Sequence, residues 1–344
     1  MEIRPPYLLF LGDARDQLAA KTAQGIVDWR REWCVGQFRL PGCKADLKIQ
    51  DLSPAEAAKA GASTMIVGVA NAGGILPDSW TKVIVEAIET GLDVASGLHT
   101  RLASKPEIAE AAHRFGRQLF DVRHADQHFE TGKGVKRSGM RLLTVGTDCS
   151  VGKKYTALVL EREMRARGFD ADFRATGQTG IFISGRGIAI DAVVADFISG
   201  AAEWISPAAE PYHWDLVEGQ GSLFHPSFAG VSLGLLHGAQ PDAFIVCHEP
   251  QRPSMRGVSH PLPTIQNVID LTIRCGALTN PGIRPVGIAV NTETLDEESA
   301  TDYLARASQD HALPATDPMR FGMSAIVDRV AADFPATLPR GRGE

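Results

Sequence analysis

The chain has 344 residues, of which 44% are hydrophobic and 22% charged, and its formal net charge is -6. This composition is typical of a soluble globular protein with room for two domains. The acidic balance argues against a dedicated nucleic-acid-binding protein. No apolar run approaches the roughly 20 residues of a membrane-spanning helix. The five cysteines form no CxxC pair, so we expect a cytoplasmic protein without disulfides or structural zinc.

The first 130 residues alternate between strand-like and helix-like segments. Strands are predicted at 7–12, 33–40, 63–74, 93–100 and 118–124. Helices are predicted at 16–30, 53–61, 79–91 and 105–116. This alternation indicates a parallel sheet with helices on both faces, and residues 1–130 are predicted to form a Rossmann-like domain. Its glycines do not match the dinucleotide pattern GxGxxG, so we do not expect NAD to bind.

A polar stretch without apolar periodicity interrupts the alternation, and we predict a linker at residues 131–139. From Met140 a second series begins. Its strands are predicted at 140–147, 171–176, 214–221, 242–250 and 284–293. Its helices are predicted at 153–168, 187–202, 226–237, 264–276, 296–309 and 323–334. Residues 140–344 are therefore predicted to form a second three-layer α/β domain, similar to P-loop NTPases, that carries the active site.

The predicted strand 140–147 runs directly into GTDCSVGKKYT, residues 146–156. Glycines let a backbone curl so that its N–H groups converge, and the start of a helix adds partial positive charge. Lys153 adds a full charge. The segment is therefore predicted to bind phosphate. The predicted cofactor-binding residues are Gly146, Thr147, Asp148, Cys149, Ser150, Val151, Gly152, Lys153, Lys154, Tyr155 and Thr156.

This loop departs from the usual pattern GxxxxGK[ST] at two positions. Thr147 stands at the place of the first glycine, and Lys154 stands where a Ser or Thr hydroxyl helps to hold Mg²⁺. Thr156 is two residues further on and, on a helix, faces elsewhere. A magnesium triphosphate is therefore disfavoured, and we expect no metal. A ligand whose phosphates lysines alone can neutralise is favoured, and coenzyme A meets that description.

Polar residues follow two further predicted strands of the second domain. Glu218 and Gln220 end the strand in LVEGQG, and His225 precedes the next helix. A carboxyl in a desolvated pocket has a raised pKa and can act as a general base, and histidine titrates near neutral pH. The sequence leaves the choice between Glu218 and His225 as catalytic base open. Gln220 is a candidate for substrate binding.

Arginines and glycines mark the remaining candidate substrate site. The strand at 242–250 is followed by Arg252 and Arg256, and a planar guanidinium binds a carboxylate through two hydrogen bonds. The segment 174–197 carries dense glycines around Gln178, Thr179 and Arg186, which suits close approach of a ligand. Any one of the three arginines is a candidate to hold a substrate carboxylate.

Three motifs in this order resemble a single family. They are GTDCSVGKKYT, ATGQTG followed by IDAVVADFISGAAE, and VEGQGSLFHPS followed by LLHGAQPDAF. The family consists of P-loop proteins with a Rossmann-like N-terminal domain, and it includes D-glutamate N-acetyltransferases. The resemblance covers nearly the whole chain. It implies acetyl transfer from acetyl-CoA, as cosubstrate, to the amino group of D-glutamate or a related D-amino acid, in D-amino-acid catabolism.

Acetyl transfer hydrolyses no phosphate, so the resemblance agrees with the loss of the magnesium-binding hydroxyl at Lys154. Two rival functions remain. The loop also resembles that of dethiobiotin synthetase, which would imply a Mg-ATP-dependent ligase or kinase, and a degenerate loop also suits a nucleotide-binding or CoA-binding sensor without catalysis. We expect a small-molecule substrate as the partner, not nucleic acid or membrane, and symmetry favours a homo-oligomer.

Overall fold

The computed structural model describes residues 2–69, 74–124 and 128–337, and the chain divides into two compact units. The first unit comprises Met1–His128 and Gly177–Ala192. The second comprises Phe129–Thr176 and Val193–Glu344. The chain therefore passes between the units three times. The sequence predicted a single passage, through a linker at 131–139 between domains at 1–130 and 140–344.

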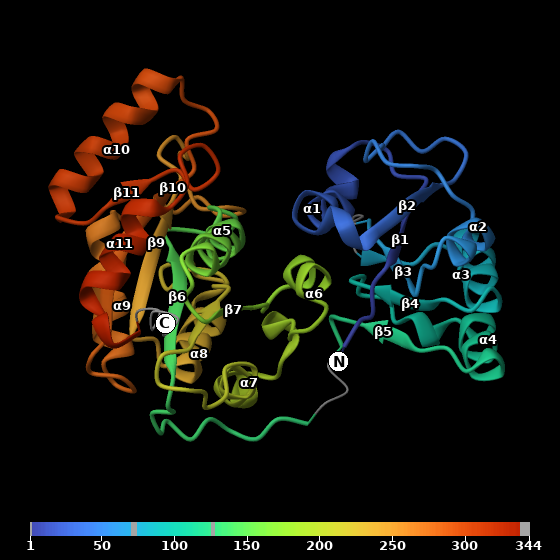
Figure 1. The fold of residues 1–344 in the computed structure, drawn as a ribbon, viewed down its shortest axis with the longest axis horizontal. Helices are drawn as coiled ribbons and strands as arrows, with labels where there is room; N and C mark the ends of the chain where they lie inside the picture. The colour runs from blue at the N-terminus through green and yellow to red at the C-terminus, as the bar shows by residue number, and fades with distance from the viewer. Residues whose placement is uncertain (1, 70–73, 125–127, 338–344) are drawn as a thin grey trace, which may run out of the picture. The chain divides into compact units, whose positions relative to one another are not determined.

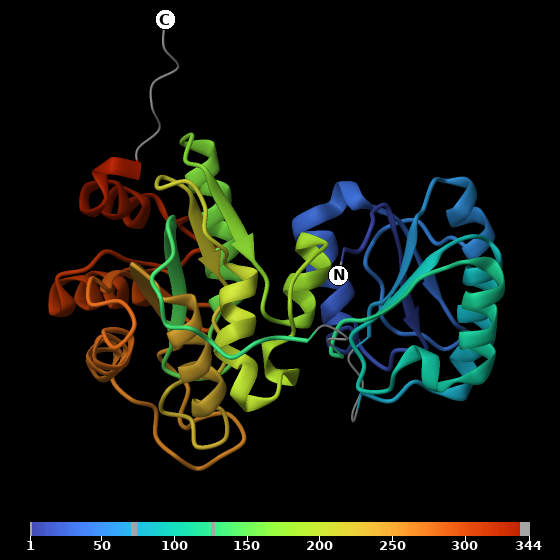
Figure 2. The same ribbon diagram turned by 90° about the horizontal axis from the view of Figure 1, so that it is seen from below.

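The first unit is a five-stranded parallel sheet with the strand order β2-β1-β3-β4-β5. Its strands are β1 (Tyr7–Gly12), β2 (Cys34–Arg39), β3 (Thr64–Val67), β4 (Asp93–Ser96) and β5 (Leu119–Asp121). Its principal helices are α1 (Lys21–Arg30), α2 (Pro54–Lys59), α3 (Asp78–Glu89) and α4 (Pro106–Phe115). Within this unit, α1 and α4 lie on opposite sides of the strands (Figure 2). The predicted Rossmann-like layering is confirmed.

The second unit is a six-stranded parallel sheet with the order β11-β10-β9-β6-β8-β7. Its strands are β6 (Met140–Gly146), β7 (Ala171–Arg174), β8 (Trp214–Val217), β9 (Ala243–His248), β10 (Arg284–Val290) and β11 (Ala315–Thr316). The first five were predicted, and the two-residue β11 was not. Strand β6 lies between β8 and β9 (Figure 1), and its middle residues are fully buried.

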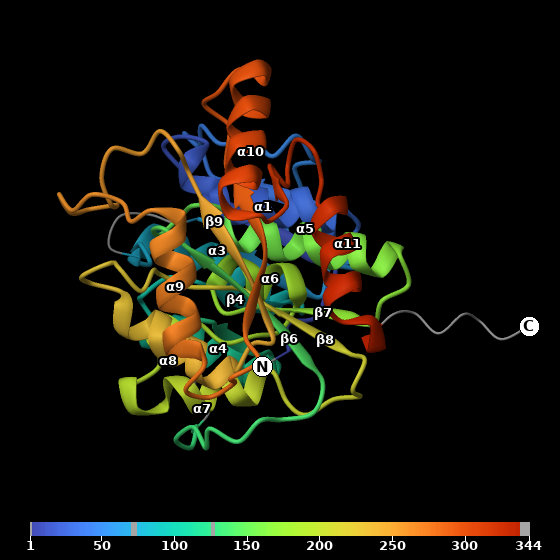
Figure 3. The same cartoon turned by 90° about the vertical axis from the view of Figure 1, so that its left-hand side faces the viewer.

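Helices cover both faces of this second sheet. They include α5 (Lys153–Ala166), α8 (Ala229–Ala239), α9 (Ile265–Gly276), α10 (Glu297–His311) and α11 (Ser324–Asp333). Figure 3 shows α8 and α9 on one side of the strands and α5 and α11 on the other. The three-layer prediction is confirmed. None of the helices within the described residues is both long and apolar enough to cross a membrane.

The predicted helix at 187–202 is wrong. The segment instead forms α6 (Gln178–Ser184), two short 3-10 turns and α7 (Ile198–Ile205). Gly185 adopts a left-handed φ of 73° and ends α6, and Gly187 has a φ of 150°, so no helix can run through them. Helix α6 buries Ile181, Phe182 and Ile183, and it packs against α1 of the first unit. Dense glycines at both ends concealed this short helix in the sequence.

The stretch predicted as a linker is bound to the second unit. Arg137 donates to the carbonyl oxygens of Ser206 and Gly238 and to the Gln240 side chain, each at 2.9 Å. Arg141, which is fully buried, donates to five backbone carbonyl oxygens from residues 137–139, 206 and 207. The apolar periodicity lapses here because polar side chains, not apolar ones, hold this segment.

We expect Arg141→Met to destabilise the second unit by about 3 kcal/mol or more, because several buried carbonyl oxygens would lose their donors. Urea unfolding followed by intrinsic fluorescence measures the change. Arg274→Met on α9 is the matched control and should change stability by less than about 0.5 kcal/mol, as is usual at surface positions. Equal stability of Arg141→Met and the wild type would contradict the assigned role.

Candidate functional site

The candidate site lies at the carboxyl ends of β6, β8 and β9. The chain adds β7 and β8 on one side of β6 and β9 to β11 on the other, so the strand order reverses beside β6. In open parallel sheets, ligands bind at this reversal point, outside the carboxyl ends of the strands. The residues predicted to bind phosphate, 146–156, follow β6 directly, and helix α5 begins at Lys153. The predicted strand, loop and helix are thus confirmed as structure.

Close backbone contacts shape the loop. Ser150 and Gly152 both have left-handed φ angles, 56° and 96°, which turn the chain into the start of α5. A Cβ atom on Gly219, after β8, would lie 1.6 Å from the carbonyl oxygen of Thr144. Only glycine therefore allows the end of β8 to approach β6, and its N–H donates to the Thr144 hydroxyl at 2.9 Å.

Lys153 is folded back into the loop. Its ammonium donates to the carbonyl oxygen of Asp148 at 2.6 Å, and the residue is only 6% exposed. Burial lowers the pKa of this ammonium, because a charge loses its hydration inside the protein. A bound anion at the loop would favour the charged form again. Phosphate binding by Lys153 stays a prediction.

Lys154 and Thr156 point in different directions. The Lys154 ammonium lies over the Tyr155 ring, 4.4 Å from its centroid, in a cation–π contact. Thr156 is buried, and its hydroxyl accepts from the Cys247 thiol of β9 at 3.5 Å. The sequence predicted only that Thr156 faces elsewhere, and the structure turns it toward the core.

The carboxylate of Asp148 is fully buried. Two residues of the loop after β9 donate hydrogen bonds to it. Oδ2 accepts from the Arg252 guanidinium at 2.7 Å and from the backbone N–H of Arg256 at 2.8 Å. Burial by itself would raise the pKa of Asp148, but these hydrogen bonds outweigh it and hold the pKa below its usual value. The carboxylate is therefore charged at neutral pH.

Arg252 binds the loop at several points. Besides Asp148, its guanidinium donates to the carbonyl oxygens of Cys149 at 2.6 Å and Ser150 at 3.2 Å, and to the Glu249 carboxylate. Arg256 donates from Nη1 to the Ser150 hydroxyl. The guanidinium of Arg252, predicted to hold a substrate carboxylate, is thus engaged by the phosphate loop itself. We assign it to support of the loop.

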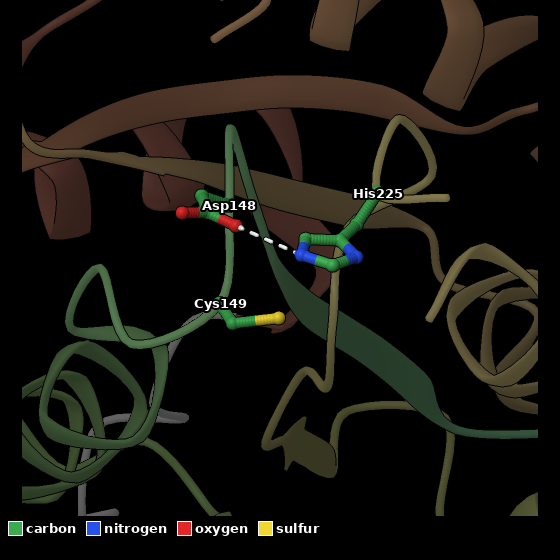
Figure 4. A group of neighbouring side chains, drawn as sticks. All are labelled: Asp148, Cys149 and His225. Carbon is green, nitrogen blue, oxygen red and sulfur yellow. Dashed lines mark ion pairs between the residues drawn. The ribbon is translucent and has the colours of Figure 1, made fainter. Parts of the chain in front are cut away.

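Asp148, Cys149 and His225 form a cluster whose potential ligand atoms lie within 4.8 Å of one another. Figure 4 shows the Asp148 carboxylate facing the His225 ring, with the Cys149 sulfur beside them. Oδ1 of Asp148 is buried without a hydrogen-bond partner among the described residues, and it lies 3.9 Å from Nε2 of His225. Burial raises the pKa of the Cys149 thiol, so this group stays protonated at neutral pH.

The hydrogen bonds of His225 decide what this cluster can do. Nδ1 accepts from the backbone N–H of Ser227 at 3.1 Å, and Nε2 lies 3.0 Å from the carbonyl oxygen of Arg256, to which it must donate. Neither nitrogen offers a lone pair to a metal ion or to a proton on a substrate. His225 was predicted as a possible general base, and this geometry gives it a structural role instead.

Glu218 and Gln220 join the ends of β7 and β8. The Glu218 side chain is buried, and Oε2 accepts from the backbone N–H of Thr176 at 3.0 Å. The Thr176 hydroxyl donates to the Glu218 carbonyl oxygen and accepts from the Gln220 amide at 3.1 Å. Both residues thus shape the turns beside the phosphate loop. A direct role in catalysis or substrate binding stays a prediction.

Gln178, Thr179 and Arg186 belong to the first unit, whereas the other predicted site residues belong to the second. With its amide oriented to satisfy both neighbours, Gln178 donates to the Gly97 carbonyl oxygen at 2.7 Å and accepts from Arg123 at 3.1 Å. Arg186 is exposed, and its backbone pairs with that of Glu2. Asn71, Ala72 and Gly73 of this unit lie outside the described residues.

His248, at the end of β9, was not predicted as a site residue. Its Nδ1 lies 3.1 Å from the Thr147 hydroxyl, and its ring stacks against Tyr303 of α10 at 6.1 Å between centroids. Burial and the neighbouring Arg252 lower the pKa of His248 to about 4. His248 is a polar residue at the carboxyl end of an apolar strand, next to the strand that leads into the phosphate loop. This position is the signal that could have revealed it.

Comparison with known proteins matches both units to one family. The P-loop domain model of DUF1611, a domain of unknown function, matches residues 128–327, and the Rossmann-like model matches residues 38–125. The chain belongs to the DUF1611 family. A crystal structure of a DUF1611 family protein from Anabaena variabilis covers 96% of this chain and all of its own, with a TM-score of 0.83 and 28% identity.

Two curated relatives of this DUF1611 protein carry the name D-glutamate N-acetyltransferase. One, from a Pseudoalteromonas species, is 53% identical over 95% of this chain and 99% of its own. The other, from Tritonibacter scottomollicae, is 51% identical over 96% and 99%. These matches confirm the family resemblance seen in the sequence. The protein is an enzyme of the acyltransferase class.

We expect Arg252→Ala to destabilise the protein by about 3 kcal/mol, because it leaves the buried Asp148 carboxylate without its guanidinium partner. Combining it with Asp148→Asn should cost less than the sum of the two single changes, because the double variant has no buried charge. Urea unfolding of the four proteins measures this coupling, and purely additive effects would contradict the buried ion pair.

The folded protein should keep His248 neutral well below pH 6.5, because the pKa of this residue falls from 6.5 to about 4 on folding. Between these values the unfolded chain binds more protons than the folded one, so stability falls as the pH falls. Side-chain NMR gives the titration midpoint. The His248→Asn variant should lose this part of the pH dependence, and the exposed control His113→Asn should retain it.

Proposed function

We propose that the protein transfers the acetyl group of acetyl-CoA to the amino group of D-glutamate or a related D-amino acid. The carrying observation is that two relatives more than 50% identical along almost their whole length bear the name D-glutamate N-acetyltransferase. The proposed setting is D-amino-acid catabolism in the cytoplasm, with the protein acting as a homo-oligomer.

The phosphate loop is the proposed site for the phosphates of coenzyme A. Lys153, Lys154 and Arg256 supply positive charge, and the N–H groups at the start of α5 add partial charge. The buried Lys153 ammonium currently makes its hydrogen bond to a backbone carbonyl oxygen, so an anionic ligand would improve its surroundings. Bound acetyl-CoA supplies a thioester carbonyl that an amine can attack.

The residue after the loop lysine supports binding without magnesium. Lys154 offers no oxygen to a metal ion, and the hydroxyl of Thr156 faces β9. Binding of a pyrophosphate by lysines needs no metal, whereas phosphoryl transfer from ATP does. The loop thus favours a cosubstrate whose phosphates are gripped and not cleaved.

The acidic acceptor needs positive charge for its carboxylates. In the second unit, Arg256 is exposed and joins the loop by Nη1, so it is our first candidate. Gln220 at the end of β8 and Gln178, Thr179 and Arg186 of the first unit remain candidates for substrate contacts. Alanine variants, each assayed for the Michaelis constant of D-glutamate, test these assignments.

The proposed reaction is tested with a free-thiol assay of acetyl-CoA and D-glutamate or L-glutamate, and with calorimetry of acetyl-CoA and ATP with and without Mg²⁺. Thiol release that depends on the D-amino acid, together with magnesium-independent acetyl-CoA binding, supports the transferase. Binding of ATP alone, and only with Mg²⁺, would favour a ligase or kinase. Binding of CoA without turnover would favour a sensor.

Lys153→Ala should weaken acetyl-CoA binding about 10- to 100-fold, since a hydrogen bond to a charged group contributes about 1.5–3 kcal/mol. Titration calorimetry without Mg²⁺ measures the affinity. Lys82→Ala, which removes an exposed lysine of α3, is the control with the same change in charge and should leave the affinity unchanged. An unchanged affinity in Lys153→Ala would place the phosphates elsewhere.

A further inference from the structure

Transfer to an amino acid requires a base, because the substrate ammonium has no lone pair until it loses a proton. At this edge of the sheet, His225 has both ring nitrogens engaged with backbone groups. Oε2 of Glu218 accepts from the Thr176 N–H inside the fold. The Asp148 carboxylate is fully buried, and its Oδ2 is engaged by the Arg252 guanidinium and the backbone N–H of Arg256.

His248 differs from these three groups. It ends β9, which pairs directly with β6, and Cys247 before it is in register with Gly146 at the start of the phosphate loop. Among the described residues, only the Thr147 hydroxyl contacts its ring by a hydrogen bond, and that contact is to Nδ1. Nε2 has no such partner, and the residue is partly exposed. One ring nitrogen is therefore anchored and the other is available.

We propose that His248 is the general base of the acetyl transfer, acting through Nε2, with Thr147 as its positioning residue. This inference rests on the proposed function. The active tautomer carries its proton on Nδ1, which donates to the Thr147 hydroxyl and leaves a lone pair on Nε2. Stacking on Tyr303 fixes the plane of the ring. The hydrogen bond to Thr147 places the base beside the loop that is proposed to hold the cosubstrate.

The proton balance is complete without a further reactant. Nε2 takes one proton from the substrate ammonium and passes it to solvent. The amine then attacks the thioester carbonyl carbon, so a C–N bond forms and the C–S bond breaks. The second proton that the nitrogen loses moves through Nε2 to the leaving thiolate, which departs as the thiol. One proton is released overall for each amide formed.

The charges around His248 suit this role. Burial and the Arg252 guanidinium on its own loop lower the pKa of His248, so the lone pair is present at neutral pH. Glu249 is bound to Arg252, the Asp148 carboxylate faces the same guanidinium, and α10 contributes Tyr303 with Arg306 near it. A bound dicarboxylate and the cosubstrate phosphates add negative charge, which raises the basicity of the ring when the site is full.

The test compares His248→Asn, Thr147→Val and Thr147→Ser with the wild-type enzyme. The asparagine amide can keep a hydrogen bond to Thr147 but lacks a basic atom, so kcat should fall about 100-fold or more. Acetyl-CoA affinity should change less than about threefold. Thr147→Val should lower kcat about tenfold, and Thr147→Ser, which keeps the hydroxyl, should lower it clearly less than Thr147→Val does. Added imidazole should partly restore His248→Ala, which a structural role would not explain.

Two results would overturn the inference. The first is a kcat of His248→Asn that lies within about threefold of the wild-type value. The second is an equal fall in kcat for Thr147→Ser and Thr147→Val, together with no rescue of His248→Ala by imidazole. If His248→Asn does not fold, the Thr147 pair and the pH profile of the wild type decide, since loss of activity with acid must report the protonation of this base. Failure of the proposed function is distinguishable, because the wild type would then release no thiol with any D-amino acid.

Discussion

The buried carboxylate of Asp148 is the charge around which this site is organised. A carboxylate without hydration is stable inside a protein only when hydrogen-bond donors surround it. Arg252 and the backbone of Arg256 supply those donors, so the segment after β9 must lie against the phosphate loop. The same guanidinium holds the carbonyl oxygens of Cys149 and Ser150. One ion pair thereby fixes the loop, and burial together with the Arg252 guanidinium lowers the pKa of His248 beside it.

The loop that results is the site that we propose for the cosubstrate phosphates, which it would bind without cleaving them. Its two lysines follow one another at the start of α5, and no hydroxyl occupies the position that magnesium would use. An enzyme that cleaves phosphates needs its metal in the transition state, whereas an acetyltransferase uses the phosphates only to bind its cosubstrate. The P-loop fold can therefore serve acyl transfer once its phosphate chemistry is lost.

The candidates for the general base show which features of the site the sequence can predict and which it cannot. Glu218 and His225 are sensible candidates because they follow an apolar strand and have the right chemistry. Their hydrogen-bond partners, however, are set by turns and by residues as distant as Arg256, and those partners occupy both nitrogens of His225. His248 follows an equally apolar strand, and only the pairing of β9 with β6 brings it to Thr147.

By itself, the sequence determined the two parallel α/β series, the strand, loop and helix around residues 146–156, and the family, because strand and helix periodicity and loop motifs are local properties. Only the tertiary structure decided that residues 177–192 join the first unit, that the predicted linker is bound by Arg137 and Arg141, and that Arg252 serves the loop. Each of these depends on contacts between residues far apart in the chain, which leave no periodic trace in the sequence.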